Sequence, residues 1–322
     1  MFKDKNILVT GGAGMIGREL IDILLQREAN ITVCDLFDPH DIENIKFIKK
    51  DLRYLDQCME ACNGKDFVFN LVGIKASPKM CAEQPADIMV PMLMFNTNMM
   101  HAAMSNKVEW YLYTSSVGVY QPAEVLYEDD VWSTQPSKND WHGGWAKRMG
   151  ELQADAYGIQ YKNKNISIVR PANVYGRYDN FDPENAMVIP ALIRKAHTNQ
   201  VLDVWGDGTP IRDFIHAKDV ARGMIYAVEN KIISPINLGS GDGVQIKTIA
   251  EIIAREFDRP IKWLPVKSPG DPRRVFDMTR ARSYGFNTTV SIEAGIKDTI
   301  DWFLKNRDSV DNRFNAFKKE VI

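Results

Sequence analysis

Short apolar runs and amphipathic stretches alternate along the first half of this chain. An apolar run at residues 6–10 leads through a glycine-rich turn into a stretch, Arg18 to Arg27, whose apolar residues recur at helical spacing. A second apolar run at residues 31–35 completes a strand–helix–strand unit, which is the building block of parallel sheets. The alternation continues with strands expected at 47–48, 66–71, 110–114 and 166–170, and helices at 55–62, 89–105 and 145–161. This pattern predicts an α/β fold with a doubly wound parallel sheet.

The rhythm changes after Pro171, where prolines and glycines become frequent up to about residue 210. Shorter segments follow, with strands expected at 201–205 and 235–238, helices at 217–229 and 246–257, and a further segment at 292–306. These segments predict a smaller mixed α/β lobe that closes over the sheet. We therefore expect a first domain at 1–170 and a second lobe at 171–322, with some chain crossing back to the first domain. The polar end, 310–322, is expected to fray.

Composition and charge exclude several classes of protein. Of the 322 residues, 45% are apolar and 25% charged, which is ordinary for a globular protein and excludes a disordered chain or a disulfide scaffold. The formal charge of −2 gives no basic field that would draw the chain to nucleic acid or to an anionic membrane. No apolar run approaches the roughly 18 residues of a membrane span and no signal peptide precedes the first strand, so we expect a cytoplasmic protein.

The four cysteines are expected to be reduced, mostly buried thiols. They are Cys34, Cys58, Cys62 and Cys81, and no two of them form a CxxC pair. No histidine cluster accompanies them. We therefore expect no bound metal.

The glycine-rich turn, with the sequence GGAGMIG, predicts a dinucleotide site. It opens a helix directly after a strand, which is the context that makes this glycine spacing specific. Gly11 allows a tight turn, Gly14 lets the backbone approach a pyrophosphate, and Gly17 permits close packing of the helix on the strand. The N–H groups at the start of the helix are then available to the phosphates. We therefore predict that residues 1–170 form a Rossmann domain.

Asp35 ends the second strand, 18 residues after Gly17. A carboxylate there accepts hydrogen bonds from both hydroxyls of the adenosine ribose and repels a 2′-phosphate, and no Arg or Lys stands in the next several residues. These features favour NAD over NADP as the cofactor. Asp51 and Leu52, after the third strand, are expected at the adenine edge. The cofactor-binding residues that we expect are Gly11, Gly14, Met15, Ile16, Gly17, Asp35, Asp51, Leu52, Leu71, Lys147 and Pro171.

Several further stretches match one family. They are 114–120, Lys147, 170–176, Asp207-Gly208, and 212–216 with 219–221 just beyond. Together with the glycine turn and Asp51-Leu52, they resemble the extended short-chain dehydrogenase/reductases, the NAD-dependent epimerase/dehydratase family that acts on nucleotide-linked sugars. The resemblance covers essentially the whole chain. It implies an NAD-dependent enzyme with a nucleotide-sugar substrate.

Within that superfamily the chain is most similar to the GDP-L-fucose synthase family. Three segments carry the likeness, 178–194, 204–214 and 272–280. That family epimerises C3 and C5 of a GDP-linked 4-keto sugar and then reduces C4, so the resemblance implies a GDP-linked substrate. It also implies Arg212 and Arg273 on the diphosphate, where a guanidinium fork suits phosphate oxygens. The other substrate-binding residues that we expect are Asn173, Val188 and Trp205, of which Trp205 would cover the base unless it packs in the core.

One catalytic residue of the family pattern is absent. Members carry Tyr-x-x-x-Lys on a helix, a spacing that puts the phenol and the ammonium on one face, and the phenol exchanges a proton as hydride moves at C4. Here the lysine is Lys147, but Gly143 stands four residues before it. The family's cysteine and histidine for the epimerisations are also replaced, by Gly118 and Met187, while Ser116 remains.

Several groups could replace the phenol. His142 is one residue further from Lys147, and we expect it in a loop before the helix, from which an imidazole could swing inward as an acid or base. The other candidates follow strand ends near the expected sugar and are Tyr120, Tyr178, Cys81 and Lys75. Without a direct replacement, water or the substrate's own groups would move the proton. The catalytic residues that we expect are Ser116, Lys147 and His142.

Three interpretations of function stay open, one of which is a regulator that senses the dinucleotide ratio. The first is an NAD-dependent epimerase, dehydratase or oxidoreductase acting at C4 of a nucleotide sugar, GDP-linked by resemblance. The second is a catalytically impaired homologue that binds NAD and a nucleotide sugar without efficient turnover. The retained Ser116, Lys147 and Asn173 favour the first, and the three lost catalytic groups favour the second. Because members of the superfamily commonly dimerise through two long helices, those at 89–105 and 145–161 imply a homodimer.

Overall fold

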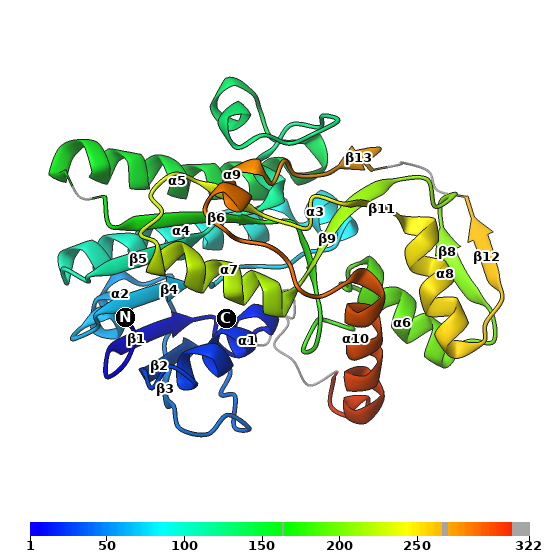
Figure 1. Cartoon of the computed structure of the whole chain (residues 1–322), viewed down its shortest axis with the longest axis horizontal. Helices are drawn as coiled ribbons and strands as arrows, with labels where there is room; N and C mark the ends of the chain where they lie inside the picture. Colours follow the sequence, from blue (N-terminus) through cyan, green and yellow to red (C-terminus); the bar gives the residue numbers. More distant parts are fainter. Residues whose placement is uncertain (163, 266–269, 311–322) are drawn as a thin grey trace.

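A seven-stranded parallel sheet forms the larger part of the protein in a computed structural model (Figure 1). The structure describes residues 1–162, 164–265 and 270–310. The strand order is β10-β6-β5-β4-β1-β2-β3, so the chain runs outward from β1 in one direction and then returns to run outward in the other. The strands are β1 (Asn6–Thr10), β2 (Asn30–Asp35), β3 (Lys46–Lys49), β4 (Phe67–Asn70), β5 (Trp110–Thr114), β6 (Ile166–Pro171) and β10 (Ile236–Leu238).

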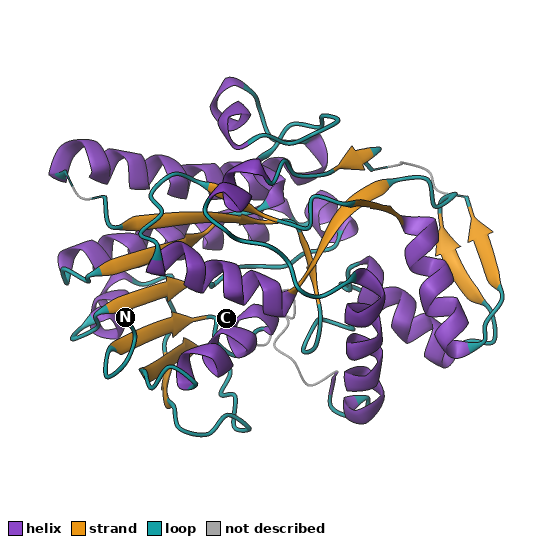
Figure 2. Cartoon of the chain, in the orientation of Figure 1, coloured by secondary structure: helices purple, strands orange, loops and turns teal. Residues whose placement is uncertain are grey.

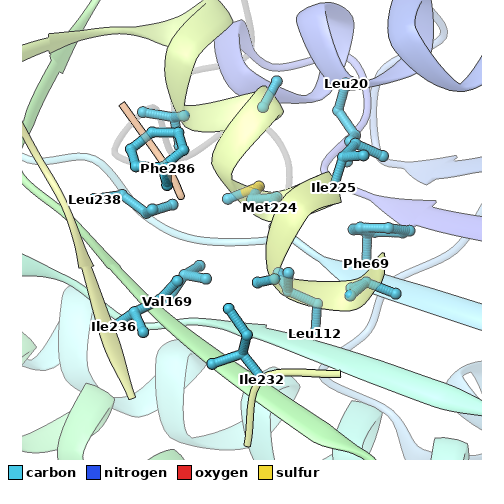
Figure 3. Packing of buried hydrophobic residues seen from close by; sticks show 14 of the residues in the cluster. Leu20, Phe69, Leu112, Val169, Met224, Ile225, Ile232, Ile236, Leu238 and Phe286 are labelled. Atoms are coloured by element: carbon cyan, nitrogen blue, oxygen red, sulfur yellow. The ribbon is translucent and has the colours of Figure 1, made fainter. Parts of the chain in front are cut away.

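Helices cover both faces of this sheet (Figure 2). One face carries α1 and α7, and the other carries α2, α4 and α5. Their bounds are α1 (Met15–Leu25), α2 (Leu55–Cys62), α4 (Pro85–Ser105), α5 (Trp141–Tyr161) and α7 (Ala217–Glu229). On the α1/α7 face, Leu20, Met224 and Phe69 of β4 belong to one hydrophobic cluster (Figure 3). The prediction of a doubly wound α/β sheet is confirmed.

A smaller lobe with its own hydrophobic cluster lies beside the sheet, on the right in Figure 1. Its central strand, β9, pairs with β7, β11 and β13, while β8 and β12 form a separate two-stranded ladder. Its strands are β7 (Asn173–Tyr175), β8 (Leu202–Trp205), β9 (Ile211–His216), β11 (Gly243–Gln245), β12 (Ile261–Leu264) and β13 (Arg273–Arg274). Its helices are α6 (Val188–Thr198), α8 (Ile246–Phe257) and α10 (Ile292–Asn306).

The lobe is joined to the sheet at the carboxyl end of β6. Only Ala172 separates β6 from β7, and β7 already pairs with β9 of the lobe. The chain later returns to the sheet, because α7 covers one face and β10 pairs with β6 at the edge. Short elements fill the remaining connections near this end. They are α3 (Pro78–Glu83), α9 (Thr279–Ser283) and the 3₁₀ turns 117–119, 128–133 and 138–140.

Two helices begin four residues earlier than the sequence pattern predicts. α4 starts at Pro85 rather than Met89, since proline is well tolerated in the first turn of a helix. α5 starts at Trp141 rather than Trp145, and two glycines therefore lie inside its first turns despite their poor helix propensity. At Gly144 packing outweighs propensity, because the carbonyl oxygen of Gly118 occupies the place of a side chain. Of the end predicted to fray, residues 311–322 lie outside the described residues.

Candidate functional site

The glycine turn between β1 and α1 packs without room for side chains. A Cβ built on Gly17 would lie 2.6 Å from the carbonyl oxygen of Gly11 and 2.6 Å from the Cα of Gly12. Gly11 has a φ of +66°, which L side chains rarely adopt. Gly14 caps α1 without a side-chain hydrogen bond, and no acidic residue occupies the first turn of the helix. The amides of Met15 and Ile16 at this helix start are thus suited to an anion, as a dinucleotide pyrophosphate requires.

Asp35 ends β2 beside this turn. Its carboxylate accepts hydrogen bonds from the amide of Ala13, at 3.1 Å, and from the amide of Leu36, at 2.7 Å, so the side chain is held in place at the strand end. Arg18 of α1 also contacts this turn, since its Nε donates to the carbonyl oxygen of Ala13 at 3.1 Å. Its guanidinium forks onto Asp41, and this hydrogen bonding lowers the pKa of the Asp41 carboxyl. A fixed acid beside a neutralised arginine suits the two free hydroxyls of an NAD ribose better than a 2′-phosphate.

The remaining predicted cofactor residues lie at the same edge of the sheet. Asp51 follows β3, where its carboxylate is held by the guanidinium of Arg53, and Leu52 is buried. Leu71 directly follows β4, and its amide donates to the carbonyl of Thr10 at the end of β1. Pro171 is the last residue of β6. Because the strands are parallel, their carboxyl ends form one edge, which is where ligands bind in sheets of this kind.

Lys147 is buried at the end of β5, on the neighbouring helix α5. Its Nζ donates a hydrogen bond of 2.7 Å to the carbonyl oxygen of Thr114, the last residue of that strand. Burial lowers the pKa of Lys147 to about 8. Ser116 follows two residues after the strand, half-buried, and its Oγ accepts a hydrogen bond from the amide of Gly118. The structure therefore brings Lys147 and Ser116 to the same strand end, as predicted catalytic partners require.

The two glycines in the first turns of α5 differ sharply in their surroundings. A Cβ on Gly144 would lie 2.3 Å from the carbonyl oxygen of Gly118 and 2.7 Å from the Cβ of Pro136. A Cβ on Gly143 would meet only the Cγ2 of Ile88, at 4.0 Å. Close approach of the chain therefore requires glycine at 144. At 143, where the family pattern has its tyrosine, the fold leaves space for a side chain that the sequence does not supply.

His142 does not lie where the sequence analysis expected it. A loop before the helix was predicted there, but α5 begins at Trp141 and includes His142 in its first turn. The imidazole is exposed, and His142 precedes Lys147 by five positions, whereas a spacing of three, four or seven positions places side chains on one helical face. The expectation of a mobile loop was wrong because the packing of Gly144 extends the helix toward its N-terminus.

The two tyrosine candidates are engaged elsewhere. Tyr120 is buried, and its hydroxyl donates to the side chain of Asn237 at 2.6 Å and accepts from the guanidinium of Arg170 at 2.9 Å. Burial raises the pKa of this phenol. Tyr178 packs its ring against Trp302, at 4.8 Å between centroids, and lies under the guanidinium of Arg18. Both tyrosines are therefore held by partners other than Lys147.

Lys75 and Cys81, which follow β4, were also candidates for the missing acid. The Nζ of Lys75 pairs at 2.6 Å with the carboxylate of Asp179, a buried residue of the loop after β7. Burial raises the pKa of the Cys81 thiol to about 11, so the thiol stays protonated near neutral pH. Lys75 therefore joins the sheet edge to the lobe, and Cys81 is no thiolate base.

The two arginines predicted on the diphosphate point to opposite sides of the lobe sheet. In the β9–β13 register, Arg212 is paired with Arg274, while Arg273 is paired with Ile211, and paired residues share a face. Arg273 donates instead to the carbonyl oxygen of Glu124, at 2.8 Å. Burial and the neighbouring Arg274 lower the pKa of Arg212 to about 10. The structure thus separates the predicted pair and puts a different arginine beside Arg212.

Arg274 belongs to a charged cluster that sequence reasoning missed. Its guanidinium pairs with Asp271 and, at 2.5 Å, with Asp140, the residue that caps α5. A Cβ on Gly118 would lie 3.6 Å from the Cγ of Asp140 and 3.5 Å from the Oγ of Ser116. The cluster therefore ties the lobe to the start of α5, next to Ser116. In the sequence, the only sign of this cluster is that Asp271 precedes Arg274 by three positions, and this spacing of an acid and an arginine is too common to indicate a site.

The last predicted substrate residues border this region from the lobe. Asn173, the first residue of β7, donates to the carbonyl oxygen of Asp213 at 2.8 Å. Val188 begins α6 and is half-buried. Trp205 ends β8 with 63% of its surface exposed, so it is not a core residue and its ring is available to a ligand.

Neither a metal centre nor a membrane helix is found in the described part of the chain. Within it, no three His, Cys, Asp or Glu side chains are grouped so that they could hold a metal ion. No helix among these residues is both long and apolar enough to span a bilayer.

Comparison with known proteins gives this geometry a context. The model of the family described as "NAD dependent epimerase/dehydratase family" matches residues 7–239. GDP-L-fucose synthase 1 of Arabidopsis thaliana is 33% identical over 233 residues, 69% of this chain and 72% of that protein. GDP-L-fucose synthase of Sinorhizobium fredii is 30% identical over 318 residues, 94% of this chain and 96% of its own length. These matches confirm the predicted family and, with it, the predicted NAD cofactor.

A solved structure supports the fold assignment. The UDP-N-acetylglucosamine 4-epimerase of Methanobrevibacter ruminantium M1, in complex with UDP-N-acetylmuramic acid, superimposes with a TM-score of 0.84 at 26% identity. The alignment covers 95% of this chain and 100% of that one. The sheet and the lobe described here therefore correspond to a complete fold of this kind.

Proposed function

Because this chain belongs to the NAD dependent epimerase/dehydratase family, we propose that it acts at C4 of a nucleotide-linked sugar, with GDP as the favoured nucleotide. The step at C4 is an oxidation or reduction, either complete in itself or the opening of an epimerisation or dehydration. The observation that carries this proposal is the meeting of Lys147 and Ser116 at the end of β5, on the same sheet edge as the glycine turn. A sugar bound there lies between the cofactor turn and the lobe.

In this proposal, different residues of the site bind NAD, the sugar and the diphosphate. When bound, NAD supplies reversible hydride transfer at its nicotinamide ring, a chemistry that side chains lack. The turn of Gly11 to Gly17 and Asp35 hold the dinucleotide, and the cation of Lys147 suits the nicotinamide ribose. Ser116 can orient a sugar hydroxyl through its Oγ. Arg212 has no acidic hydrogen-bond partner among the described residues, and so it suits the charge of the diphosphate.

Support for GDP comes from the relatives and from the lobe. The two relatives reported above are named GDP-L-fucose synthases. The solved structure with UDP-N-acetylmuramic acid holds a different base in the same fold, so the fold alone does not determine which base is bound. In this chain the exposed ring of Trp205 offers a flat apolar surface on which a guanine could stack.

A second candidate function is binding without efficient turnover. Gly143, Gly118 and Met187 stand where the GDP-L-fucose synthase pattern has groups that move protons, and none of these three side chains can do so. A general acid or base contributes typically 10²–10⁴-fold to a rate, so their loss is large if nothing compensates. The intact Lys147 and Ser116 at the strand end favour the catalytic proposal over this one.

We also propose that the protein is a cytoplasmic homodimer. The long helices α4 and α5 lie on one face of the sheet and present exposed apolar side chains, which are Val90, Met94, Leu152, Ile159 and Tyr161. Such a set on two adjacent helices is suited to burial against a second copy. Analytical ultracentrifugation of the wild type and of Ile159→Glu checks this, and a wild-type monomer would refute the dimer.

The choice of nucleotide is tested by a thermal-shift panel on NAD-loaded protein. GDP-, UDP- and dTDP-hexoses are compared at equal concentration, since a ligand that binds only the folded state raises the melting temperature further the more tightly it binds. The GDP sugars are expected to give the largest shift. An equal or larger shift with UDP or dTDP sugars would overturn the assignment of the base, and no shift with any of them would overturn the proposed function.

A further inference from the structure

Lys147 is a buried amine with an unoccupied position one helical turn away. Of the three N–H donors of its ammonium group, the described contacts account for one, to the carbonyl oxygen of Thr114. Gly143 lies on the same face of α5, four residues earlier, and its missing side chain leaves space bordered by Ile88. On the β4 side, a Cβ on Gly73 would be 3.9 Å from Nζ, so small residues border the amine there as well.

We propose that Lys147 itself exchanges the proton with the C4 hydroxyl of the sugar, across the space that Gly143 leaves open. This inference rests on the proposed function and deepens it, since it names the acid and base of the step at C4. Lys147 thereby takes over a role for which the fold retains room but the sequence has no phenol.

The step balances with NAD as the only co-reactant. In the oxidation, the neutral amine of Lys147 takes the proton of the C4 hydroxyl, the C4–H bond breaks with transfer of hydride to NAD⁺, and a C4 ketone and NADH result. In the reduction, the ammonium of Lys147 returns the proton to the carbonyl oxygen as NADH returns the hydride. No other oxidant, reductant or acid is consumed.

The charged surroundings of Lys147 allow both protonation states. Burial lowers its pKa to about 8, and Glu151 on the next turn of α5 opposes that shift. Glu151 is itself neutralised by the buried guanidinium of Arg170 from β6. From β5, the phenol of Tyr113 donates to the carbonyl oxygen of Lys147, and burial raises the pKa of this phenol, so it stays neutral.

The contrast between the two glycines argues that the open space serves the site. Gly144 is glycine because the carbonyl oxygen of Gly118 approaches too closely for any side chain. No such contact accounts for Gly143, where even a large side chain has room at its first atom. The bare position is therefore not required by close packing at its Cβ, and it leaves open space on the helical face that carries Lys147.

The sign of the pH dependence follows from the direction of proton transfer. Oxidation requires the neutral amine, so its rate rises as pH increases through about 8. Reduction requires the ammonium, so its rate falls through the same range. An unperturbed lysine, with a pKa of about 10.4, would place both changes more than two pH units higher.

A nuclear magnetic resonance titration tests the amine without reference to activity. Protein labelled with ¹³C at lysine Cε is titrated with NAD bound, and the Lys147 signal is identified by its loss in Lys147→Arg. The expected midpoint is about 8, apart from the other lysines. A midpoint above about 10 would overturn the role of Lys147 whatever the enzyme does.

Turnover of two variants completes the test. Lys147→Arg keeps a permanent cation that cannot exchange a proton, so NAD affinity is expected within about threefold of wild type while oxidation falls by about 100-fold and loses its rise near pH 8. Lys147→Gln, whose smaller side chain also cannot exchange a proton, is the second variant and is expected to lose the same oxidation activity. Lys138→Arg, on the surface turn before α5, is the control. Wild-type oxidation by Lys147→Arg would show that only the cation matters and would overturn the proposal. A wild type with a midpoint near 8 that reduces no NAD⁺ with any nucleotide sugar would instead overturn the proposed function.

Discussion

Two glycine-rich segments, the turn before α1 and the start of α5, lie at the same edge of the sheet, and glycine is present in them for different reasons. In the cofactor turn between β1 and α1, Gly11 adopts a positive φ and Gly17 meets backbone atoms at 2.6 Å, so contacts require the glycine at each position. At the start of α5, contacts require Gly144 but not Gly143, which has nothing but Ile88 within 4 Å of its built Cβ. A glycine with a packing reason maintains a shape. A glycine without one, such as Gly143 near the buried Lys147, leaves open space on the helix.

The largest expected effect tests the difference within α5. Gly144→Ala forces a Cβ into the carbonyl oxygen of Gly118, and overpacking of this kind is expected to lower the free energy of unfolding by about 3 kcal/mol. Gly143→Ala should leave stability unchanged or raise it by up to about 1 kcal/mol, because alanine is the better helix former. Urea denaturation of both variants measures the difference. Equal losses at the two positions would break the comparison between them.

The next effect concerns the cofactor turn. Gly17→Ala puts a Cβ on the backbone of the turn itself, so the turn must open and NAD affinity is expected to fall by about 100-fold, which is roughly 2.7 kcal/mol. Isothermal titration with NAD measures it, with Gly143→Ala as the control that should bind normally. If Gly17→Ala bound NAD as well as wild type does, this turn would not be the pyrophosphate site.

A smaller effect separates the two arginines of the lobe. Arg212→Ala is expected to weaken nucleotide-sugar binding by about 30-fold, because a charge-assisted contact to the diphosphate is lost. Arg273→Ala should change the same affinity by no more than about threefold, since its side chain lies on the other face of the sheet and binds the loop at Glu124. Equal losses in titration calorimetry would place both arginines on the diphosphate, as the sequence analysis expected.

The smallest effect is on cofactor choice. Asp35→Asn keeps an acceptor for the amide of Ala13 but removes the charge, so the affinity for NADP is expected to rise by about tenfold while that for NAD falls only a few-fold. Fluorescence titration with both cofactors measures the ratio. A ratio that does not move would mean that Arg18, through its pair with Asp41, and not Asp35, sets the preference.

The sequence predicted those parts of the fold and site that depend on local pattern. The helices at 217–229 and 246–257 have the bounds expected from their apolar spacing, and the turn between β1 and α1 lies where its glycines, between an apolar run and a helical period, predicted it. By contrast, α3 and α6 were not predicted, because α3 is too short to show a period and α6 follows a stretch rich in proline and glycine. Local periodicity therefore locates long elements well and short connecting ones poorly.

The sugar end of the site needed tertiary information. Which of the two neighbouring arginines, Arg273 or Arg274, is paired with Arg212 depends on the register of β9 and β13, which no local pattern fixes. The approach of Asp140 to Ser116 and Gly118 brings two short turns together through contacts that only the folded structure creates. The same holds for His142, whose place in the helix follows from the packing of Gly144 against a distant loop.

We propose that this site transfers hydride at C4 of a nucleotide sugar although it lacks the tyrosine that serves as acid and base in the family pattern. A single-turnover measurement of NADH tests this proposal. NAD-loaded protein is mixed with a GDP-hexose in single turnover, and the near-ultraviolet absorbance of NADH is followed as a function of pH. The account predicts NADH formation that becomes faster as pH rises through about 8 in the wild type and is reduced by about 100-fold in Lys147→Arg. NADH formation that is equally fast in Lys147→Arg, or that does not change with pH in this range, would contradict it.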